Sequence, residues 1–141
     1  MESPTADKFK AICCRLHEAI PPSFARQWDD RFGVALISFD SAVREKILAA
    51  LKADFPHQWD KSSIGKARKE VNKTVKSVFN INTGQFVFST DENQIFVLLA
   101  AWWPWGNGAT ISLRVGIFAA GNETIDDAEA KKLLTSWFSI A

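Results

Sequence analysis

The chain has 141 residues, of which 47% are hydrophobic and 23% are charged, and its formal net charge is +1. This composition is typical of a globular protein and excludes a disordered or fibrous chain, while the length predicts a single domain over residues 1–141. Because the charges nearly balance, the chain as a whole has no strong attraction for nucleic acid or anionic lipid, and any such affinity requires a local patch.

The cysteines and the amino terminus indicate the compartment. Cys13 and Cys14 are neighbours in a helical pattern, so they point in different directions and cannot link distant segments, which favours a reducing environment. The first residues lack the basic-then-apolar layout of a secretory signal, and the longest apolar run, 95–105, is about half of a membrane span. We therefore expect a cytoplasmic protein without a membrane span.

The first helix is predicted over residues 4–20. Its apolar side chains recur at helical spacing, Ser3 and Pro4 have the arrangement of a helix start, and a Pro-Pro pair follows its last residue. The next apolar segment, 31–39, is either a short strand or a buried connector.

Two further helices are predicted in the first half of the chain. Asp40 is a suitable N-cap for a helix over 41–55, which ends before a proline, and a third helix over 63–79 has one narrow apolar stripe. Arg44 falls on the arc of the second helix that should be buried. Its stem could lie along apolar surface with its charge in water, or its charge could require a buried carboxylate.

The period of the pattern changes from 3.6 to 2 after the third helix. The segments GQFVFST, QIFVLLAAWW and ATISLRVGIFA, joined by DEN and PWGNG, predict an antiparallel meander of three to four strands over about 85–119. A closing helix is predicted over about 125–138, with Thr124 as its cap and acidic residues in its first turns. The chain is therefore expected to form an α+β domain.

The hairpin around PWGNG decides which side chains share a sheet face. If these five residues form the loop, Trp103 lies opposite Ala109, and one face of the hairpin is purely apolar. The other face combines aromatic with polar side chains, although a one-residue change in either loop would reassign residues between the faces. We call this second face, with Trp105 of the loop, the predicted aromatic surface: Phe86, Phe88, Phe96, Leu98, Trp102, Trp105, Ser112 and Arg114.

Two interpretations of the predicted aromatic surface stay open. A helix could cover it and make the sheet the middle layer of a sandwich, or it could be open to a partner, since aromatic residues beside one arginine are typical of protein interfaces. Trp105 stands between a proline and a glycine, so it either folds back onto the edge of the core or reaches outward.

The third predicted helix carries a basic stripe. Lys66, Lys69, Lys73 and Lys76 recur at spacings of three and four residues, opposite the apolar stripe. Such a stripe is either a solvated helix face or a site for an acidic protein or a nucleic acid. Stacking on single strands would need aromatic side chains among the lysines, so nucleic acid is the weaker alternative.

No motif in the sequence predicts a catalytic, cofactor or metal site. Cys13 and His17 lie four residues apart on the first helix, but no clear second pair of ligands accompanies them. His57 and Asp60 could form an orienting pair for acid–base chemistry, or could fill a turn after a helix. We expect no cofactor and no metal, with an enzyme that has an unrecognised site near His57 and Asp60 as an alternative.

The function that we expect is binding without catalysis. Inhibition, neutralisation or escort of one protein partner, as in immunity proteins, antitoxin-like proteins and secretion chaperones, suits a domain of this size, although that assignment rests on analogy alone. A second copy of the chain could be that partner. The alternative is an accessory nucleic-acid-binding protein that uses the lysine stripe.

Overall fold

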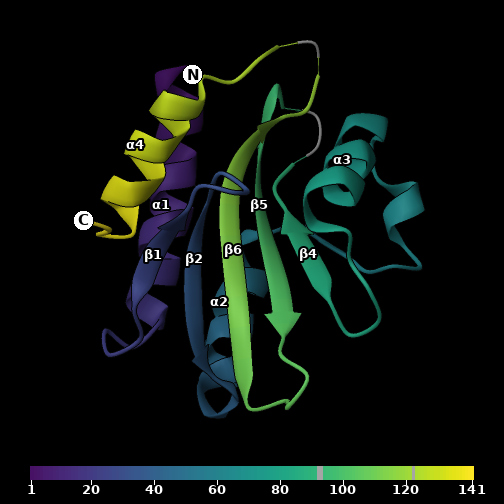
Figure 1. Cartoon of the computed structure of the whole chain (residues 1–141). Helices are drawn as coiled ribbons and strands as arrows, with labels where there is room; N and C mark the ends of the chain where they lie inside the picture. Colours follow the sequence, from purple (N-terminus) through teal and green to yellow (C-terminus); the bar gives the residue numbers. More distant parts are fainter. Residues whose placement is uncertain (92–93, 122) are drawn as a thin grey trace.

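The computed structural model describes residues 1–91, 94–121 and 123–141. In this part of the chain, helices pack against a six-stranded antiparallel sheet with the strand order β1-β2-β6-β5-β4-β3 (Figure 1). The α+β class is as expected. The elements, in chain order, are α1 (Ser3–Ala19), β1 (Arg26–Asp29), β2 (Val34–Asp40), η1 (Ser41–Val43), α2 (Arg44–Asp54), β3 (His57–Trp59), η2 (Ile64–Lys66), α3 (Lys69–Thr74), η3 (Val75–Phe79), β4 (Phe86–Ser89), β5 (Phe96–Pro104), β6 (Thr110–Ala119) and α4 (Asp127–Trp137).

The sheet is larger than the expected three to four strands because β1, β2 and β3 come from the first half of the chain. The apolar segment 31–39 supplies β2, which forms a hairpin with β1 and pairs on its other side with β6. Gly33 in the hairpin turn has a φ of 68°, a left-handed conformation that glycine adopts without a steric penalty. At the opposite edge, β3 pairs with β4.

The expected single helix over 63–79 is interrupted. The short 3-10 turn η2 is followed by extended backbone at Ala67 and Arg68, then by α3 and by the π-helical turn η3. The apolar stripe is nevertheless buried along its length. Val71, Val75 and Phe79 follow one another at intervals of four residues, more than the 3.6 of an α-helix turn, and the wider π turn keeps them on the side of the sheet.

Two helix starts also differ from expectation. Asp126, rather than Thr124, caps α4, and its carboxylate accepts hydrogen bonds from the backbone N–H groups of residues 128 and 129. The helix α2 begins only at Arg44, after the 3-10 turn η1, so the Arg44 side chain lies at the exposed start of the helix. It pairs with the exposed Glu45 at 3.3 Å, and the expectation that it lies on a buried arc was wrong.

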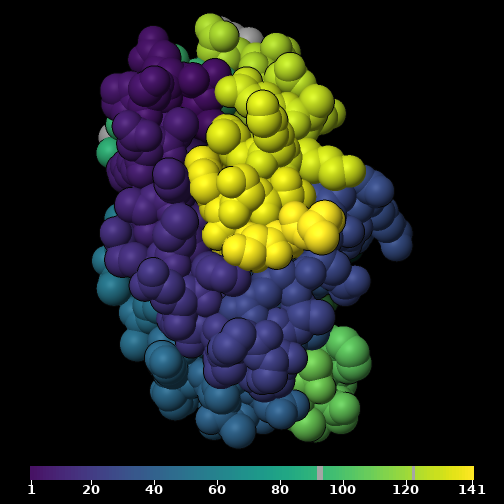
Figure 2. Space-filling model, turned by 90° about the vertical axis from the view of Figure 1, so that its left-hand side faces the viewer, coloured from purple at the N-terminus to yellow at the C-terminus, as the bar shows by residue number. Residues whose placement is uncertain are grey.

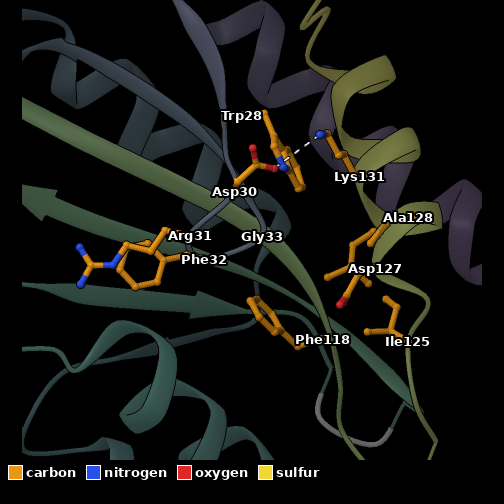
Figure 3. A pocket seen from close by; sticks show the side chains of 12 residues that line it. Trp28, Asp30, Arg31, Phe32, Gly33, Phe118, Ile125, Asp127, Ala128 and Lys131 are labelled. Carbon is orange, nitrogen blue, oxygen red and sulfur yellow. Dashed lines mark hydrogen bonds and ion pairs between the residues drawn. The ribbon is translucent and has the colours of Figure 1, made fainter.

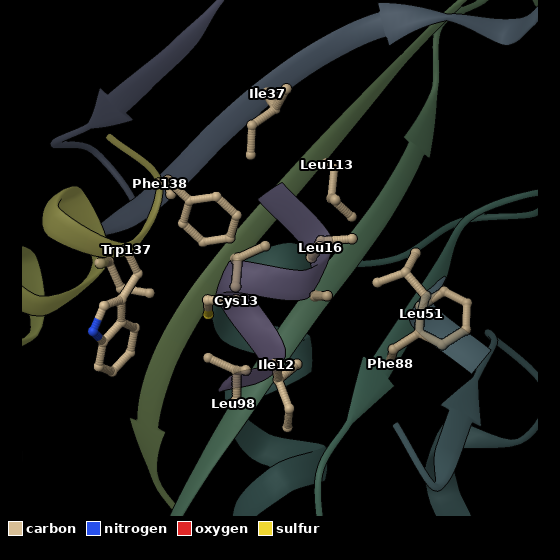
Figure 4. Packing of buried hydrophobic residues seen from close by; sticks show 14 of the residues in the cluster. Ile12, Cys13, Leu16, Ile37, Leu51, Phe88, Leu98, Leu113, Trp137 and Phe138 are labelled. Atoms are coloured by element: carbon tan, nitrogen blue, oxygen red, sulfur yellow. The ribbon is translucent and has the colours of Figure 1, made fainter. Parts of the chain in front are cut away.

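One face of the sheet, the inner face, lies under α1, α2 and α4 (Figures 1 and 4). In Figure 2 the purple α1 and the yellow α4 pack side by side over this side of the molecule. The inner face and the helices above it form an apolar cluster whose largest fully buried members are Phe9, Phe39, Phe88, Phe138, Ile37, Ile47, Leu51, Leu98, Leu113 and Leu134.

Arg26 fastens the end of α1 to β1. Its guanidinium donates hydrogen bonds to the carbonyl oxygens of His17, Ile20, Pro21 and Phe24 at 2.6–3.0 Å, and its Nε donates to His17 Nδ1 at 3.2 Å. The last carbonyls of a helix have no partner within the helix, so this one side chain satisfies groups that would otherwise need water.

The opposite face, the outer face, has two unlike halves. Segments η2, α3 and η3 cover the half over β4 and β5, where they enclose a second apolar cluster that includes Val71, Val75, Val87 and Leu99. Val34 at the start of β2 belongs to this cluster, but over β1, the rest of β2 and the adjoining part of β6, the described chain places no helix on this face (Figure 1). We call this the open half; its side chains are Gln27, Asp29, Leu36, Ser38, Ser112 and Arg114.

Candidate binding site

The register of the β5–β6 hairpin determines which side chains face the open half. Trp103 pairs with Ser112 instead of Ala109, a shift of three residues from the expected register, which was wrong. Pro104 belongs to β5, and Trp105 N–H donates to the Thr110 carbonyl at 2.8 Å, so the loop is 106–109 rather than PWGNG. Because the shift is an odd number of residues, each β6 side chain lies on the face of the sheet opposite to the one expected relative to β5.

The predicted aromatic surface is therefore divided between the two faces. Phe86, Phe88, Phe96, Leu98 and Trp102 share a face, as expected, but it is the inner face, where Phe88 and Leu98 are fully buried beneath the helices. Ser112 and Arg114 lie on the outer face, and Trp103, which the expected register paired with the core, lies beside them. Of the predicted set, the structure brings together Trp105, Ser112 and Arg114.

Trp105 folds back onto the open half while staying half exposed. Its indole Nε1–H donates a hydrogen bond to Ser112 Oγ at 2.8 Å, and Ser112 Oγ lies 3.0 Å from Ser38 Oγ. Trp105 is nevertheless 50% exposed, so a large part of its aromatic ring remains in contact with water. In Figure 2 the green loop that follows it projects from the lower edge of the molecule.

Beside these residues, the outer face contains a cleft of about 250 Å³. It lies between the β1–β2 turn, η3 and the outer residues of β5 and β6. We call it the aromatic–arginine cleft; its lining residues are Arg31, Phe32, Val78, Phe79, Trp103 and Arg114.

Cations and aromatic rings alternate along the aromatic–arginine cleft. The Arg31 Cζ lies 4.9 Å from the centroid of the Phe32 ring. The Arg114 Cζ lies 6.0 Å from the same centroid and 5.7 Å from that of Trp103. Guanidinium groups within about 6 Å of a ring centroid are attracted by the negative face of the ring. Both rings are therefore within the range of cation–π attraction to the Arg114 guanidinium.

One hydrogen-bond donor of the Arg114 side chain has no acceptor. Its Nε is buried and has no hydrogen-bond partner. Burial lowers the pKa of Arg114, while the nearby Asp29 carboxylate acts in the opposite direction, and a guanidinium remains charged at neutral pH. A buried donor without an acceptor costs about 1–3 kcal/mol. Groups of this kind in native proteins call for an explanation, and a functional role is one of the recognised ones.

A second cavity of about 390 Å³ lies on the other side of the β1–β2 turn (Figure 3). Arg31 and Phe32 line both cavities, so the turn is their common wall. In Figure 3, Lys131 Nζ faces Asp30 Oδ1, 3.5 Å away, and it also lies 5.8 Å from the centroid of the Trp28 ring. Two acidic and two basic residues line this cavity, so its formal charges balance.

The lysine stripe is exposed along η2, α3 and η3. Lys69, Lys73 and Lys76 lie on the continuous α3–η3 segment, whereas Lys66 lies in η2, before the extended residues that interrupt the helix. The opposite side of this segment, including Val78 and Phe79, contacts the sheet or lines the aromatic–arginine cleft.

His57 and Asp60 have separate local contacts. The His57 ring stacks on Trp59 with a centroid distance of 5.3 Å. The Asp60 carboxylate accepts hydrogen bonds from the Ser62 hydroxyl and from the backbone N–H groups of Ser62 and Ser63, and these bonds lower the pKa of Asp60. Within 1–91, 94–121 and 123–141, no group of three or more His, Cys, Asp or Glu side chains could hold a metal ion.

Of the six residues that line the cleft, sequence reasoning selected only Arg114. Phe32, Val78 and Phe79 were assigned to apolar segments, and only the pairing of β2 with β6 and the path of η3 bring them next to Arg114. One signal in the sequence was the Arg31–Phe32–Gly33 segment, where an aromatic residue stands beside an arginine and a turn-forming glycine.

None of the helices in the described part of the chain is long and apolar enough to cross a membrane. Comparison of the chain with protein-family models, with curated proteins and with solved structures found no significant match.

Proposed function

We propose that the protein acts by binding another protein through the open half of the outer sheet face. The observation that carries this proposal is Arg114, fixed between Phe32 and Trp103 at the edge of a cleft, with a buried Nε that has no partner. A structural role alone would favour an apolar residue at this position, because burying the Nε–H donor without an acceptor is unfavourable.

The composition and shape of the open half support the same conclusion. Tryptophan and arginine are the residues that contribute most often to the centre of protein interfaces. Trp103 and Arg114 lie in the cleft, and the half-exposed Trp105 flanks them. The strands β1 and β2 continue this surface with Leu36 and with the polar Gln27, Asp29 and Ser38, which would form the rim of an interface.

Such binding suits a protein that inhibits, neutralises or escorts a single partner. The open half would then be the recognition surface, while the inner face and its three helices supply the stability of the fold. Catalysis has no part in this proposal.

A photo-cross-linking experiment tests the proposed surface. The photoreactive residue p-benzoylphenylalanine replaces Leu36 on the open half, and in a matched control replaces Ala49, an exposed residue of α2. In the cells that normally make the protein, we expect one dominant protein adduct from position 36 and none from position 49, with a weaker adduct when Trp105→Ala is added. Equal adducts from both positions, or none from position 36, would contradict the proposal.

A further inference from the structure

We propose that the aromatic–arginine cleft binds a carboxylate carried on an apolar group, so that the partner presents an acidic side chain flanked by apolar residues. This inference rests on the proposed function, since it specifies the chemistry of the partner at the same surface.

The charges around the cleft favour an anion. Arg31 and Arg114 line it, and no acidic residue does so among the described residues. The acid that acts on Arg114 is Asp29, whose charge favours the charged form of Arg114 and whose Oδ1 accepts a hydrogen bond from the backbone N–H of Arg31 at 3.0 Å. Two guanidinium groups therefore face one carboxylate, and one positive charge remains for a ligand.

The geometry of Arg114 favours a planar anion. Its Cζ lies 6.0 Å and 5.7 Å from the ring centroids of Phe32 and Trp103, and its Nε is buried without a partner. The terminal Nη nitrogens are the atoms that a ligand in the cleft can reach. Two parallel N–H donors on one edge match the two oxygens of a carboxylate, and such charge-assisted pairs are stronger than neutral hydrogen bonds.

The remaining walls indicate that the anion is attached to hydrocarbon. Apart from Arg31 and Arg114, the residues that line the cleft are all apolar: Phe32, Val78, Phe79 and Trp103. A strongly hydrated anion such as inorganic phosphate would lose its water here without gaining the additional donors that it requires. An acidic side chain that enters with apolar neighbours would place its oxygens on Arg114 and its hydrocarbon against these walls.

The second cavity provides an internal contrast. There Lys131 lies 3.5 Å from Asp30, and the acidic Asp127 also lines the space, so positive charge is compensated within the protein. The two cavities share Arg31 and Phe32, yet the excess positive charge is on the side of Arg114.

A titration with a small probe tests this inference without a partner protein. The probe is 3-phenylpropanoate, the control ligand is 3-phenylpropanamide, and the signals are the Trp103 indole N–H and the Arg114 Nε–H in NMR spectra of the labelled protein. We expect saturable shifts with the acid in the millimolar range, as is usual for so small a ligand, and binding of the amide that is weaker by about tenfold or more.

Matched variants locate the charge that binds the probe. We expect Arg114→Gln to abolish the response of Trp103, and Arg31→Gln, at an exposed position, to weaken it. Arg15→Gln is the control, because Arg15 is an exposed arginine of α1 that pairs with Asp54 at 2.8 Å. If Arg114→Gln disturbs the fold, Arg31→Gln still tests the inference.

Three results would overturn the carboxylate assignment. These are equal affinity for acid and amide, binding that both arginine variants retain, and inorganic phosphate that competes as well as the acid. Since the titration contains no partner, its failure leaves the cross-linking from position 36 to decide the proposed function. Conversely, if the probe binds but position 36 gives no adduct, the protein-binding proposal fails, and with it the inference that a partner's acidic side chain occupies the cleft.

Discussion

The inner and outer faces of the sheet use the same strands for different purposes. Along β6, Leu113 and Val115 point to the inner face and are fully buried, while Ser112 and Arg114 point to the outer face and are polar or charged. Helices cover the whole length of one face and only part of the other. In this protein the alternation of side chains along a strand separates the residues that stabilise the core from those of the proposed recognition surface.

The largest expected difference between the faces comes from one substitution made on each. Leu98→Ala removes a fully buried side chain from the inner face and should lower the free energy of unfolding by about 2–5 kcal/mol. Leu36→Ala on the open half should lower it by less than about 1 kcal/mol, because this side chain is already partly hydrated. Urea unfolding measures both values, and equal losses would show that the open half is part of the core.

Gly116 tests how tightly the covered half of the outer face is packed. A Cβ at this position would lie 2.7 Å from the Phe118 ring and 2.8 Å from a Val34 methyl group. We expect Gly116→Ala to lower the free energy of unfolding by about 1–3 kcal/mol through overpacking. Gly65→Ala is the control, since no atom lies within 4 Å of its Cβ position. Similar midpoints for the two variants in thermal unfolding would contradict this packing.

A change of pH should loosen the helical cover of the inner face. Partial burial, and then the Arg26 charge, lower the pKa of His17 below its ordinary value. Protonated His17 cannot accept the hydrogen bond from Arg26 Nε, so the unfolded chain binds the proton more readily. Stability is therefore complete above the unfolded pKa of about 6.5 and falls as the pH drops through that value toward the folded pKa.

The measurement is urea unfolding at pH 7.5 and at pH 5, compared between the natural chain and His17→Gln. We expect the variant to show a smaller loss of stability at the lower pH. An identical loss in both proteins would assign the pH dependence to other groups.

A smaller effect is expected from removing the charge at the cleft. Arg114→Leu deletes an unpaired buried donor and two contacts with aromatic rings, contributions that nearly cancel. We expect the free energy of unfolding to stay within about 1 kcal/mol of the natural value, while the cross-link from position 36 is lost. A large loss of stability would identify Arg114 as a structural residue of the fold.

The smallest effect is expected from the lysine stripe. Lys73→Ser and Lys76→Ser change exposed positions and should alter stability by less than about 0.5 kcal/mol each. They should leave the cross-link from position 36 unchanged. If the partner were instead a nucleic acid bound to this stripe, each variant should flatten the dependence of binding on salt by about one phosphate contact.

Local patterns were sufficient for the fold class and for the longer elements. The helical period located α1, α2 and α4 to within a few residues, and the alternation after residue 85 located β4, β5 and β6. Strands β1 and β3 have only four and three residues, too few to show an alternation. Strand β3 joins the sheet by pairing with β4, about 30 residues further along the chain, and β1 joins it through β2, which itself pairs with the distant β6; no local pattern encodes these long-range pairings.

The candidate site was only partly predictable for a related reason. Trp105, Ser112 and Arg114 could be selected because a hairpin with so many aromatic residues is unusual. Their neighbours could not, because the position of Pro104 in the strand and the four-residue loop 106–109 set the register. A shift of this kind leaves the composition of each strand unchanged and alters every contact across it.

The π-helical turn η3 makes the cleft sensitive to the number of residues as well as to their identity. A π turn corresponds to an α-helix with one residue inserted. Deleting one residue between 75 and 79 would restore the α-helical period and rotate everything beyond the deletion by about 100°. Phe79 would then leave the wall of the cleft without any substitution in the cleft itself, so a single codon lost in this segment would remove one side of the proposed recognition surface.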